Sequence, residues 1–360
     1  MIWAFILSVI YVPGWIGAAI PTGWAFISLT VPVLIWRGPA LPRPLQILGL
    51  SAIAFAFLSL AWAPLPTFAI YTLWLQFCLG LIYILGVKLP SLEAIRKGLA
   101  LGLSVSSLLC IVQYLGWNPV LQYDPTQPSG LLFNPSIAGA AFGLAVLWLA
   151  LHRNWRYIPA LLPGLALNHT RTVWAMLAAT ALVWIARNVR YGWLGLCAAI
   201  AAVAWYLFHV SPHDSTRVQL WTVIYEHLYW FGHGPGILNY ITVRLGDLMA
   251  RPEYAHNEYL DFIAQYGIGA APIFVLAAIP LLAWRNPDWY VYVAFLSLAL
   301  FSYPLRSVPV AVIGLILAGH LSRDWAVVRA NLDRCRLVLP AWCRATQWRN
   351  DRKGAAIVSV

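Results

Sequence analysis

Long apolar runs make up most of the chain, and short stretches rich in Pro, Gly or charged residues separate them. A transmembrane helix needs about 20 predominantly apolar residues. The pattern predicts an all-α fold in a single domain, 1–360, built as a polytopic membrane helix bundle. We expect about 12 transmembrane helices. The range is 10–12, because the second and seventh apolar runs are near the lower length limit for a span. We expect the helices at residues 2–20, 23–36, 45–62, 67–87, 98–117, 135–151, 156–168, 172–187, 191–210, 259–284, 289–304 and 308–321.

The first apolar run, 2–20, is expected to be a retained span and not a removable signal peptide. No basic region precedes it, and no small-residue cleavage site followed by soluble sequence comes after it. We find no internal repeat at solenoid spacing and no duplicated transporter halves, in agreement with one domain.

Two polar segments between the apolar runs are longer than a turn. Residues 118–135, NPVLQYDPTQPSGLLFNP, are expected to form an irregular loop that caps the bundle or dips into it. Residues 211–258 form a larger extramembrane loop, in which Ser215 is a candidate N-cap for a helix from Thr216 to Trp230. We expect this helix to lie on the membrane surface or over the mouth of the bundle, with FGHGPG (231–236) ending it. Its apolar face is predicted to contain Val218, Trp221, Tyr225, Leu228 and Tyr229.

Composition agrees with a membrane location. Of the 360 residues, 61% are hydrophobic and only 10% are charged, and 20 are tryptophan. The net charge of +11 comes from short basic flanks between apolar runs and from a basic tail, 322–360. Because no basic face is interleaved with stacking aromatics, we exclude nucleic acid as a partner. The 5 cysteines form neither a disulfide framework nor a CxxC pattern.

The basic residues also predict the orientation of the chain. If both termini are cytoplasmic, 18 of the 23 Lys and Arg residues fall on the cytoplasmic side, as the positive-inside rule requires. The loop 211–258 then lies on the side opposite the cytoplasm. The opposite face keeps only five arginines, which are Arg171, Arg217, Arg244, Arg251 and Arg306.

These external arginines point to an anionic ligand. One external arginine alone is explained by pairing with a nearby acid or by anchoring at the headgroup level. However, Arg171 and Arg217 each stand at the start of a predicted helix, and Arg251 lies five residues before His256. A guanidinium group suits phosphate oxygens, so a lipid-linked pyrophosphate at the outer surface fits the pattern.

The polar stretch at the start of the tenth predicted span supplies a candidate base. A neutral imidazole such as that of His256 accepts a proton from an attacking hydroxyl near neutral pH. Asn257, Glu258 and Arg251 are candidate substrate-binding residues, although Asn257 could serve only as a helix cap and Arg251 as a partner of Glu253. Paired metal-ligand motifs such as HEXXH are absent from the sequence, so we expect no metal and no other cofactor.

Several blocks of the sequence resemble a known superfamily. STRVQLW (215–221), WFGHGPGILNY (230–240) and AHNEYLDFIAQYGIG (255–269) are similar to the periplasmic loop and following helix of the O-antigen ligase and Wzy-type O-antigen polymerase superfamily. LFNPSIAGAAFGLAV (132–146) and NHTRTVWAML (168–177) resemble its upstream elements. The likeness covers about residues 130 to 270. The family often has Glu two residues before the Gly of the last block, where this chain has Gln265.

The resemblance implies a multi-span glycosyltransferase of the bacterial inner (plasma) membrane with a periplasmic active site. Such an enzyme moves a glycan from undecaprenyl pyrophosphate to an acceptor on the periplasmic face, without a metal. Matched residue by residue, Arg171 and Arg217 would hold the pyrophosphate, and His256 would activate the acceptor hydroxyl. The implied acceptor is lipid A core for an O-antigen ligase, our first expectation, or a second lipid-linked glycan for a polymerase.

Two further functions stay open. One is protein O-oligosaccharide transfer. The other is a flippase or transporter of polyprenyl-linked glycans that performs no catalysis. Proton- or ion-coupled transporters usually carry charged residues deep in their spans, and the centres of the predicted spans contain none.

Overall fold

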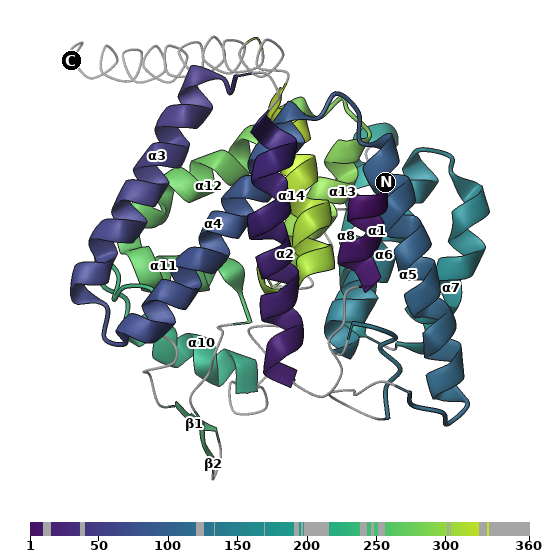
Figure 1. Ribbon diagram of the computed structural model, residues 1–360, viewed down its shortest axis with the longest axis horizontal. Coiled ribbons are helices and arrows are strands. Elements are labelled where there is room, and N and C mark those ends of the chain that lie inside the picture. The colour runs from purple at the N-terminus through teal and green to yellow at the C-terminus, as the bar shows by residue number, and fades with distance from the viewer. Residues whose placement is uncertain are drawn as a thin grey trace, which may run out of the picture.

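The structure of the chain is a computed structural model. It describes residues 1–9, 16–36, 40–119, 126–132, 134–168, 170–190, 216–237, 243–245, 248–250, 256–300 and 304–323, together with the single positions 194, 195, 197, 302 and 330. These residues form a bundle of helices with one short β-hairpin at one end (Figure 1). The all-α prediction is therefore confirmed, apart from the hairpin.

The bundle consists of helices of unequal length. The α-helices are α1 (Ile2–Val9), α2 (Ile16–Trp36), α3 (Arg43–Leu58), α4 (Pro66–Lys88), α5 (Glu93–Tyr114), α6 (Pro135–Leu151), α7 (Ile158–Leu167), α8 (Arg171–Asn188), α10 (Thr216–Glu226), α11 (Glu258–Tyr266), α12 (Ala271–Ala278), α13 (Asp288–Ala299) and α14 (Val308–Arg323). Short 3-10 helices are η1 (Ser59–Trp62), η2 (Trp155–Tyr157), η5 (Gly267–Ala270), η6 (Ile279–Ala283) and η7 (Pro304–Arg306). Strands β1 (Val243–Leu245) and β2 (Leu248–Ala250) pair antiparallel, with Val243 opposite Ala250.

Four helical segments in the described residues are long and apolar enough, by length and composition, to cross a membrane. They are Arg43–Trp62, Pro66–Lys88, Glu93–Tyr114 and Glu258–Ala283. Shorter apolar helices accompany them. Eight of the predicted spans coincide with helices, namely 45–62, 67–87, 98–117, 135–151, 156–168, 172–187, 289–304 and 308–321. The span predicted at 191–210 lies outside the described residues except for three positions, so the total of twelve stays a prediction.

The boundary between the first two predicted spans is wrong. The sequence suggested a break at Pro21, between 2–20 and 23–36, but α2 runs without interruption from Ile16 to Trp36. Apolar helices packed among others tolerate an internal proline, because neighbouring groups satisfy the freed backbone carbonyl. The first helix is correspondingly shorter, with α1 ending at Val9.

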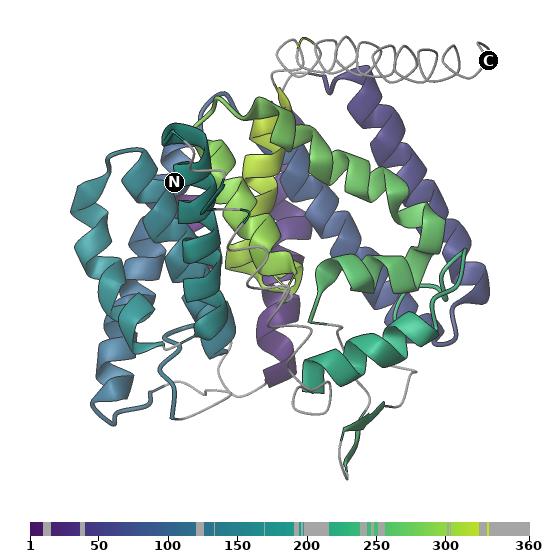
Figure 2. The same ribbon diagram turned by 180° about the vertical axis from the view of Figure 1, so that it is seen from behind.

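The predicted span 259–284 is also not one straight helix. It is divided into α11, the 3-10 turn η5 and α12, and Figure 2 shows α11 and α12 as two arms of a bend. Gly267, at the end of α11, has φ 52° and ψ −128°, a conformation that side chains with a Cβ rarely adopt. The bend therefore has a local cause in the sequence.

The centre of the bundle is the contact between α4 and α14. Their backbones approach closely where glycines face each other: a Cβ at Gly86 would collide with the carbonyl oxygen of Ile316, and one at Gly319 with that of Tyr83. Small residues permit such close packing in apolar bundles. The Tyr83 hydroxyl also lies 2.9 Å from Ser322 Oγ. This contact joins parts of the chain that are far apart in sequence.

The C-termini of α2, α4 and α14 lie at one end of the bundle, the upper end in Figure 1. Lys88 Nζ donates to the Ile35 carbonyl at 2.9 Å, and Arg323 Nη1 donates to the Leu89 carbonyl at 2.9 Å. Cations are favourable at helix C-termini, where unpaired carbonyls carry partial negative charge. These residues belong to the set predicted to be cytoplasmic, so the fold gathers members of that set at one end.

Candidate functional site

The opposite end of the bundle contains α10, the hairpin and the start of α11 (Figure 1). α10 covers Thr216–Glu226, so the predicted surface helix exists but ends four residues before Trp230. Its buried face is also different from the prediction: Leu220 and Ile224 are buried, whereas Tyr225 is 73% exposed. Leu220 and Ile224 pack against Ile237 and Ala264, so tertiary contacts with α11 decide which face is buried.

The glycine-rich segment 231–236 is fastened to the end of α11. His233 N and Gly234 N donate to the carbonyls of Ala264 and Gln265, both at 2.9 Å. Ile268 N donates to the Trp230 carbonyl at 2.8 Å. These bonds satisfy backbone carbonyls that the end of a helix leaves unpaired. Two of the blocks that carry the resemblance are thus in direct contact.

Glycine is required on both sides of this contact. A Cβ at Gly232 would collide with the carbonyl of Gln265, and a Cβ at Gly267 would collide with the carbonyl of Trp230. Both glycines also have positive φ, 69° and 52° respectively. The glycines in these two blocks therefore serve a close approach of two backbones.

A second pair of blocks meets at the start of α6 and α8. Asn134 caps α6 by accepting from Ser136 N at 2.8 Å, as expected for Asn before a helix that begins with Pro135. Asn168 is buried and donates to the Pro128 carbonyl at 3.1 Å. The Thr170 hydroxyl donates to the Pro135 carbonyl at 3.1 Å. Pro128 and Pro135 are thereby held against the residues that precede α8.

The backbone of the predicted base is unusual. His256 has φ 53°, and among the described non-glycine residues only Arg153 shares a positive φ. This left-handed conformation disfavours side chains with a Cβ, although histidine tolerates it better than most. Asn257 follows and caps α11, because its Oδ1 accepts from Leu260 N at 3.1 Å. The imidazole therefore stands at the N-terminal end of α11, where backbone N–H groups are concentrated.

Glu258 does not face open solvent. It is 4% exposed, and its Oε1 accepts from Leu305 N at 2.9 Å, which joins α11 to the residues before α14. Its predicted contact with substrate stays a prediction. The capping role of Asn257, considered from the sequence, is the one that the structure shows.

The three predicted arginines are only partly placed. Arg171 is the first residue of α8 and Arg217 the second of α10, but their side chains lie outside the description. Arg251 lies outside the described residues altogether. The grouping of these arginines with His256 therefore stays a prediction.

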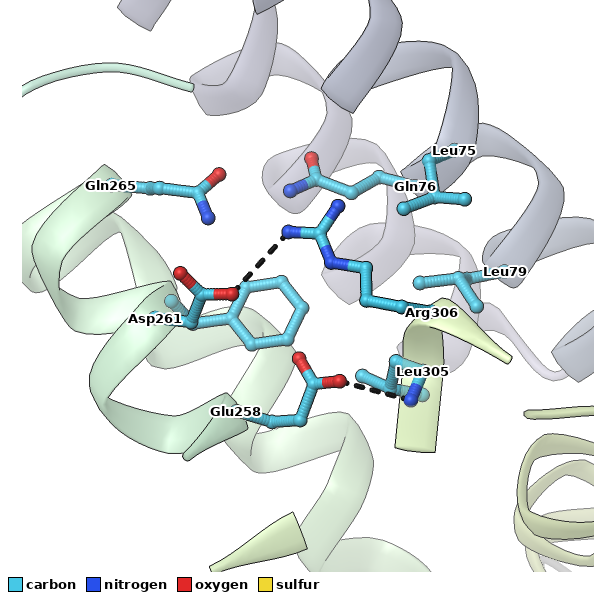
Figure 3. Close-up of a pocket in the computed structure, with 9 residues that line it drawn as sticks. Leu75, Gln76, Leu79, Glu258, Asp261, Gln265, Leu305 and Arg306 are labelled. Atoms are coloured by element: carbon cyan, nitrogen blue, oxygen red, sulfur yellow. Dashed lines mark hydrogen bonds and ion pairs between the residues drawn. The ribbon is translucent and has the colours of Figure 1, made fainter. Parts of the chain in front are cut away.

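The structure also shows a buried polar cluster that the sequence analysis did not assemble (Figure 3). Arg306 Nη2 lies 3.3 Å from Asp261 Oδ2, and the Arg306 side chain is 11% exposed. The side chains of Gln265, Gln76 and Glu258 surround this ion pair. The Tyr266 hydroxyl donates to Gln76 Oε1 at 2.5 Å, fixing α4 against α11. We call these side chains, Glu258, Asp261, Gln265, Arg306 and Gln76, the polar cluster.

A signal for this cluster was present in the sequence. Glu258, Asp261 and Gln265 are spaced by three and four residues, which puts them on one face of a helix. The partner Arg306 was one of the five external arginines. Only the fold brings η7 against α11, because the two segments are separated by α12 and α13.

Comparisons with known proteins do not indicate a function for this chain. Among the described residues, no three His, Cys, Asp or Glu side chains are grouped as a metal site would require, and the expected independence from metals stays a prediction. No protein-family model matches the chain, and no curated protein matches it either. Fold and composition define the class: a helical protein with the properties of a polytopic membrane protein.

Proposed function

We propose that the protein is a membrane glycosyltransferase that uses a polyprenyl-diphosphate-linked donor, in the manner of an O-antigen ligase. The main support is the arrangement around α11. The glycine-rich segment 231–236 is fastened to α11, and His256 has a strained backbone directly before the Asn257 cap. Residues held in sparsely populated backbone conformations cluster at functional sites.

In the proposed reaction, His256 takes the proton from the acceptor hydroxyl. The hydroxyl oxygen attacks the anomeric carbon of the donor glycan and forms the new glycosidic bond. The bond between that carbon and the diphosphate oxygen breaks on the opposite side, so the configuration inverts. The polyprenyl diphosphate leaves with the electron pair, and Arg171 and Arg217 stabilise the negative charge that develops on it.

The acceptor defines the finer function. A ligase would use lipid A core, and a polymerase would use a second lipid-linked glycan. A deletion strain distinguishes them on a gel of surface polysaccharide, because bare core indicates loss of a ligase and one-repeat caps indicate loss of a polymerase. Transfer to a purified protein acceptor tests the third possibility, protein O-oligosaccharide transfer.

The proposal is tested by single substitutions in purified protein with defined donor and acceptor. We expect His256→Ala to lower transfer by about 10²–10⁴-fold, the usual contribution of a general base. Arg171→Gln and Arg217→Gln should each lower transfer by about 10²–10³-fold, as loss of one preorganised donor does.

His227→Ala is the matched control for His256→Ala. His227 lies at the same end of the bundle and is exposed, and its imidazole Nδ1 lies 2.7 Å from the backbone carbonyl of Val223. We expect wild-type transfer from this variant. Wild-type transfer from His256→Ala would remove the base from the mechanism.

Lipid transport without catalysis is a second candidate, favoured by one observation. The Asp261–Arg306 ion pair is buried beside a helix that is broken at Gly267, and transporters often combine intramembrane charges with broken helices. Product formation in detergent, where no second compartment exists, separates the two functions. A transporter would give no product there.

A further inference from the structure

A large apolar crevice lies between α3 and α4, beside the polar cluster. Its volume is about 760 Å³, within the range of small-molecule sites in proteins. Apolar side chains of α3, α4, α12, α13 and α14 line it, and several of them, such as Leu50 and Phe57, are exposed at its mouth. Because α3 and α4 are both in segments long and apolar enough to cross a membrane, we infer that this mouth opens toward lipid.

Two glycines keep the crevice wide. Gly49 on α3 and Gly80 on α4 both line it, and a Cβ at either position would meet nothing within 4 Å. Elsewhere on α4, Gly86 serves a tight contact with α14 instead. Apolar interiors are normally close-packed. A space of this size, flanked by two glycines without neighbours, therefore fits an occupant such as a lipid chain.

The inner end of the crevice reaches the polar cluster. Gln76, Glu258 and Leu305 line both the crevice and the small cavity inside the cluster. An apolar chain lying in the crevice would thus bring its polar end to the cluster. The crevice supplies the apolar half of an amphiphile site, and the cluster supplies the polar half.

The cluster has unused hydrogen-bond acceptors. Asp261 and Gln265 are 2% and 3% exposed. The Gln265 side chain interacts with the Asp261 carboxylate, but within the described residues neither Asp261 Oδ1 nor Gln265 Oε1 has a partner in full hydrogen-bond geometry. Buried polar atoms are nearly always paired, so each of these oxygens calls for a donor. In Figure 3 the Asp261 carboxylate and the Gln265 amide both point into the space next to Arg306.

The charge of the cluster selects the kind of donor. It contains the carboxylates of Glu258 and Asp261 but only one guanidinium, that of Arg306. A phosphate brought here would meet two acidic side chains and a guanidinium that already pairs with Asp261, so the cluster disfavours it. A hydroxyl or an ammonium group would instead donate to the unpaired oxygens.

We propose that the crevice and the polar cluster together bind a long-chain amphiphile with a small hydrogen-bond-donating head, a hydroxyl or a primary ammonium. The chain lies between α3 and α4, and the head donates to Asp261 and Gln265. This site adjoins the proposed glycan-transfer site at Glu258. The inference does not depend on glycan transfer, because its readout is binding.

The test is competitive photolabelling of the full-length protein in lipid nanodiscs. The probe is an 18-carbon alcohol with a diazirine in its chain, and mass spectrometry maps the labelled residues. The competitors share one chain: oleyl alcohol, oleylamine, oleyl phosphate and oleyl methyl ether. We expect labels on α3, α4 and α12, and competition by the alcohol or the amine about tenfold stronger than by the ether, as one or two hydrogen bonds to a buried acceptor provide.

Two variants and one control separate the halves of the site. Gly80→Phe fills the crevice and should abolish specific labelling, and Gln265→Met removes one unpaired oxygen and should reduce the preference for the alcohol over the ether. Leu108→Phe is the control, because Leu108 is exposed on α5 and does not line the crevice. It should label as the wild type does.

Several outcomes would overturn the proposal. Equal competition by all four lipids would show that the crevice holds only an annular lipid chain. Preference for oleyl phosphate would show that the cluster binds an anion. The competition between alcohol and amine shows which head group the site prefers. All four competitors are compared on the wild-type protein, so a variant that fails to fold leaves this test intact.

Discussion

His256 shows how a residue that is ordinary in the sequence acquires a special state in the fold. A left-handed backbone such as that of His256, φ 53°, costs about 1–3 kcal/mol in conformational free energy. Contacts in the surrounding structure must therefore hold His256 in this conformation. The Asn257 cap on one side fixes the start of α11 directly after it. The backbone of His256 is thereby placed directly before the first turn of α11.

The buried ion pair permits a prediction at the same scale. Arg306→Met leaves the Asp261 carboxylate buried beside Glu258 without a counter-charge, so we expect a loss of about 3–5 kcal/mol in the free energy of unfolding. The double variant Arg306→Met, Asp261→Leu should recover most of this loss, since no unpaired charge remains from the pair. Denaturant unfolding in detergent micelles measures both.

Lys97→Met is the control for the ion pair. Lys97 pairs with Glu93 on the surface of α5, where solvent screens the interaction. We expect no measurable change in unfolding. If Arg306→Met were as stable as this control, the pair would have no structural role, and the polar cluster would be held by other contacts.

At the scale of elements, the bend between α11 and α12 joins the surface segment to the bundle. Gly267 forms the bend. The Trp230 carbonyl and the Gly232 backbone N lie too close to Gly267 to admit a Cβ there. The same bend directs Glu258, Asp261 and Gln265 toward η7. The geometry of the candidate site therefore depends on a single backbone conformation.

We predict that Gly267→Ala lowers the free energy of unfolding by about 1–3 kcal/mol. Alanine is strained at this positive φ, and its Cβ would collide with the Trp230 carbonyl. The segment 230–236 should detach from α11, so glycan transfer should fall as well. Gly80→Ala is the control: it lies within a helix with free space around it, and alanine there stabilises by up to about 1 kcal/mol. Unfolding in micelles and protease sensitivity of residues 230–236 measure the effect. Equal stability of the two variants would contradict it.

At the scale of the whole molecule, the two ends of the bundle differ in chemistry. Basic side chains that pair with helix C-termini collect at one end, and α10, the hairpin and the start of α11 lie at the other. Exposed aromatic residues occur at both ends, for example Trp155 at the basic end and Tyr229 at the other. Aromatic residues at both boundaries are typical of proteins that cross a bilayer.

This asymmetry predicts the result of labelling in intact cells. Trp155 and Tyr229 are each 60% exposed, so cysteine at either site should be accessible to reagent on its own side. In a variant without the native cysteines, Tyr229→Cys should react with a membrane-impermeant maleimide, and Trp155→Cys should react only after the cells are opened. The reverse pattern would place α10 and His256 in the cytosol, where the proposed donor site could not operate.

The sequence by itself determined the class of fold, most helix positions and the sorting of basic residues, because the length of an apolar run and the charge of its flanks are local properties. It also marked Asn257 as a candidate helix cap. It placed the break between the first two helices wrongly, since a proline alone does not show whether neighbouring helices will tolerate it.

Only the tertiary structure decided which face of α10 is buried and that Arg306 meets Asp261. Each of these depends on contacts between segments far apart in sequence, and the free energy of such contacts is set by the partner as much as by the residue itself. The apolar crevice between α3 and α4 has the same origin. Whether a glycine fits a close contact, as Gly86 does, or borders open space, as Gly80 does, depends on what the fold brings opposite it.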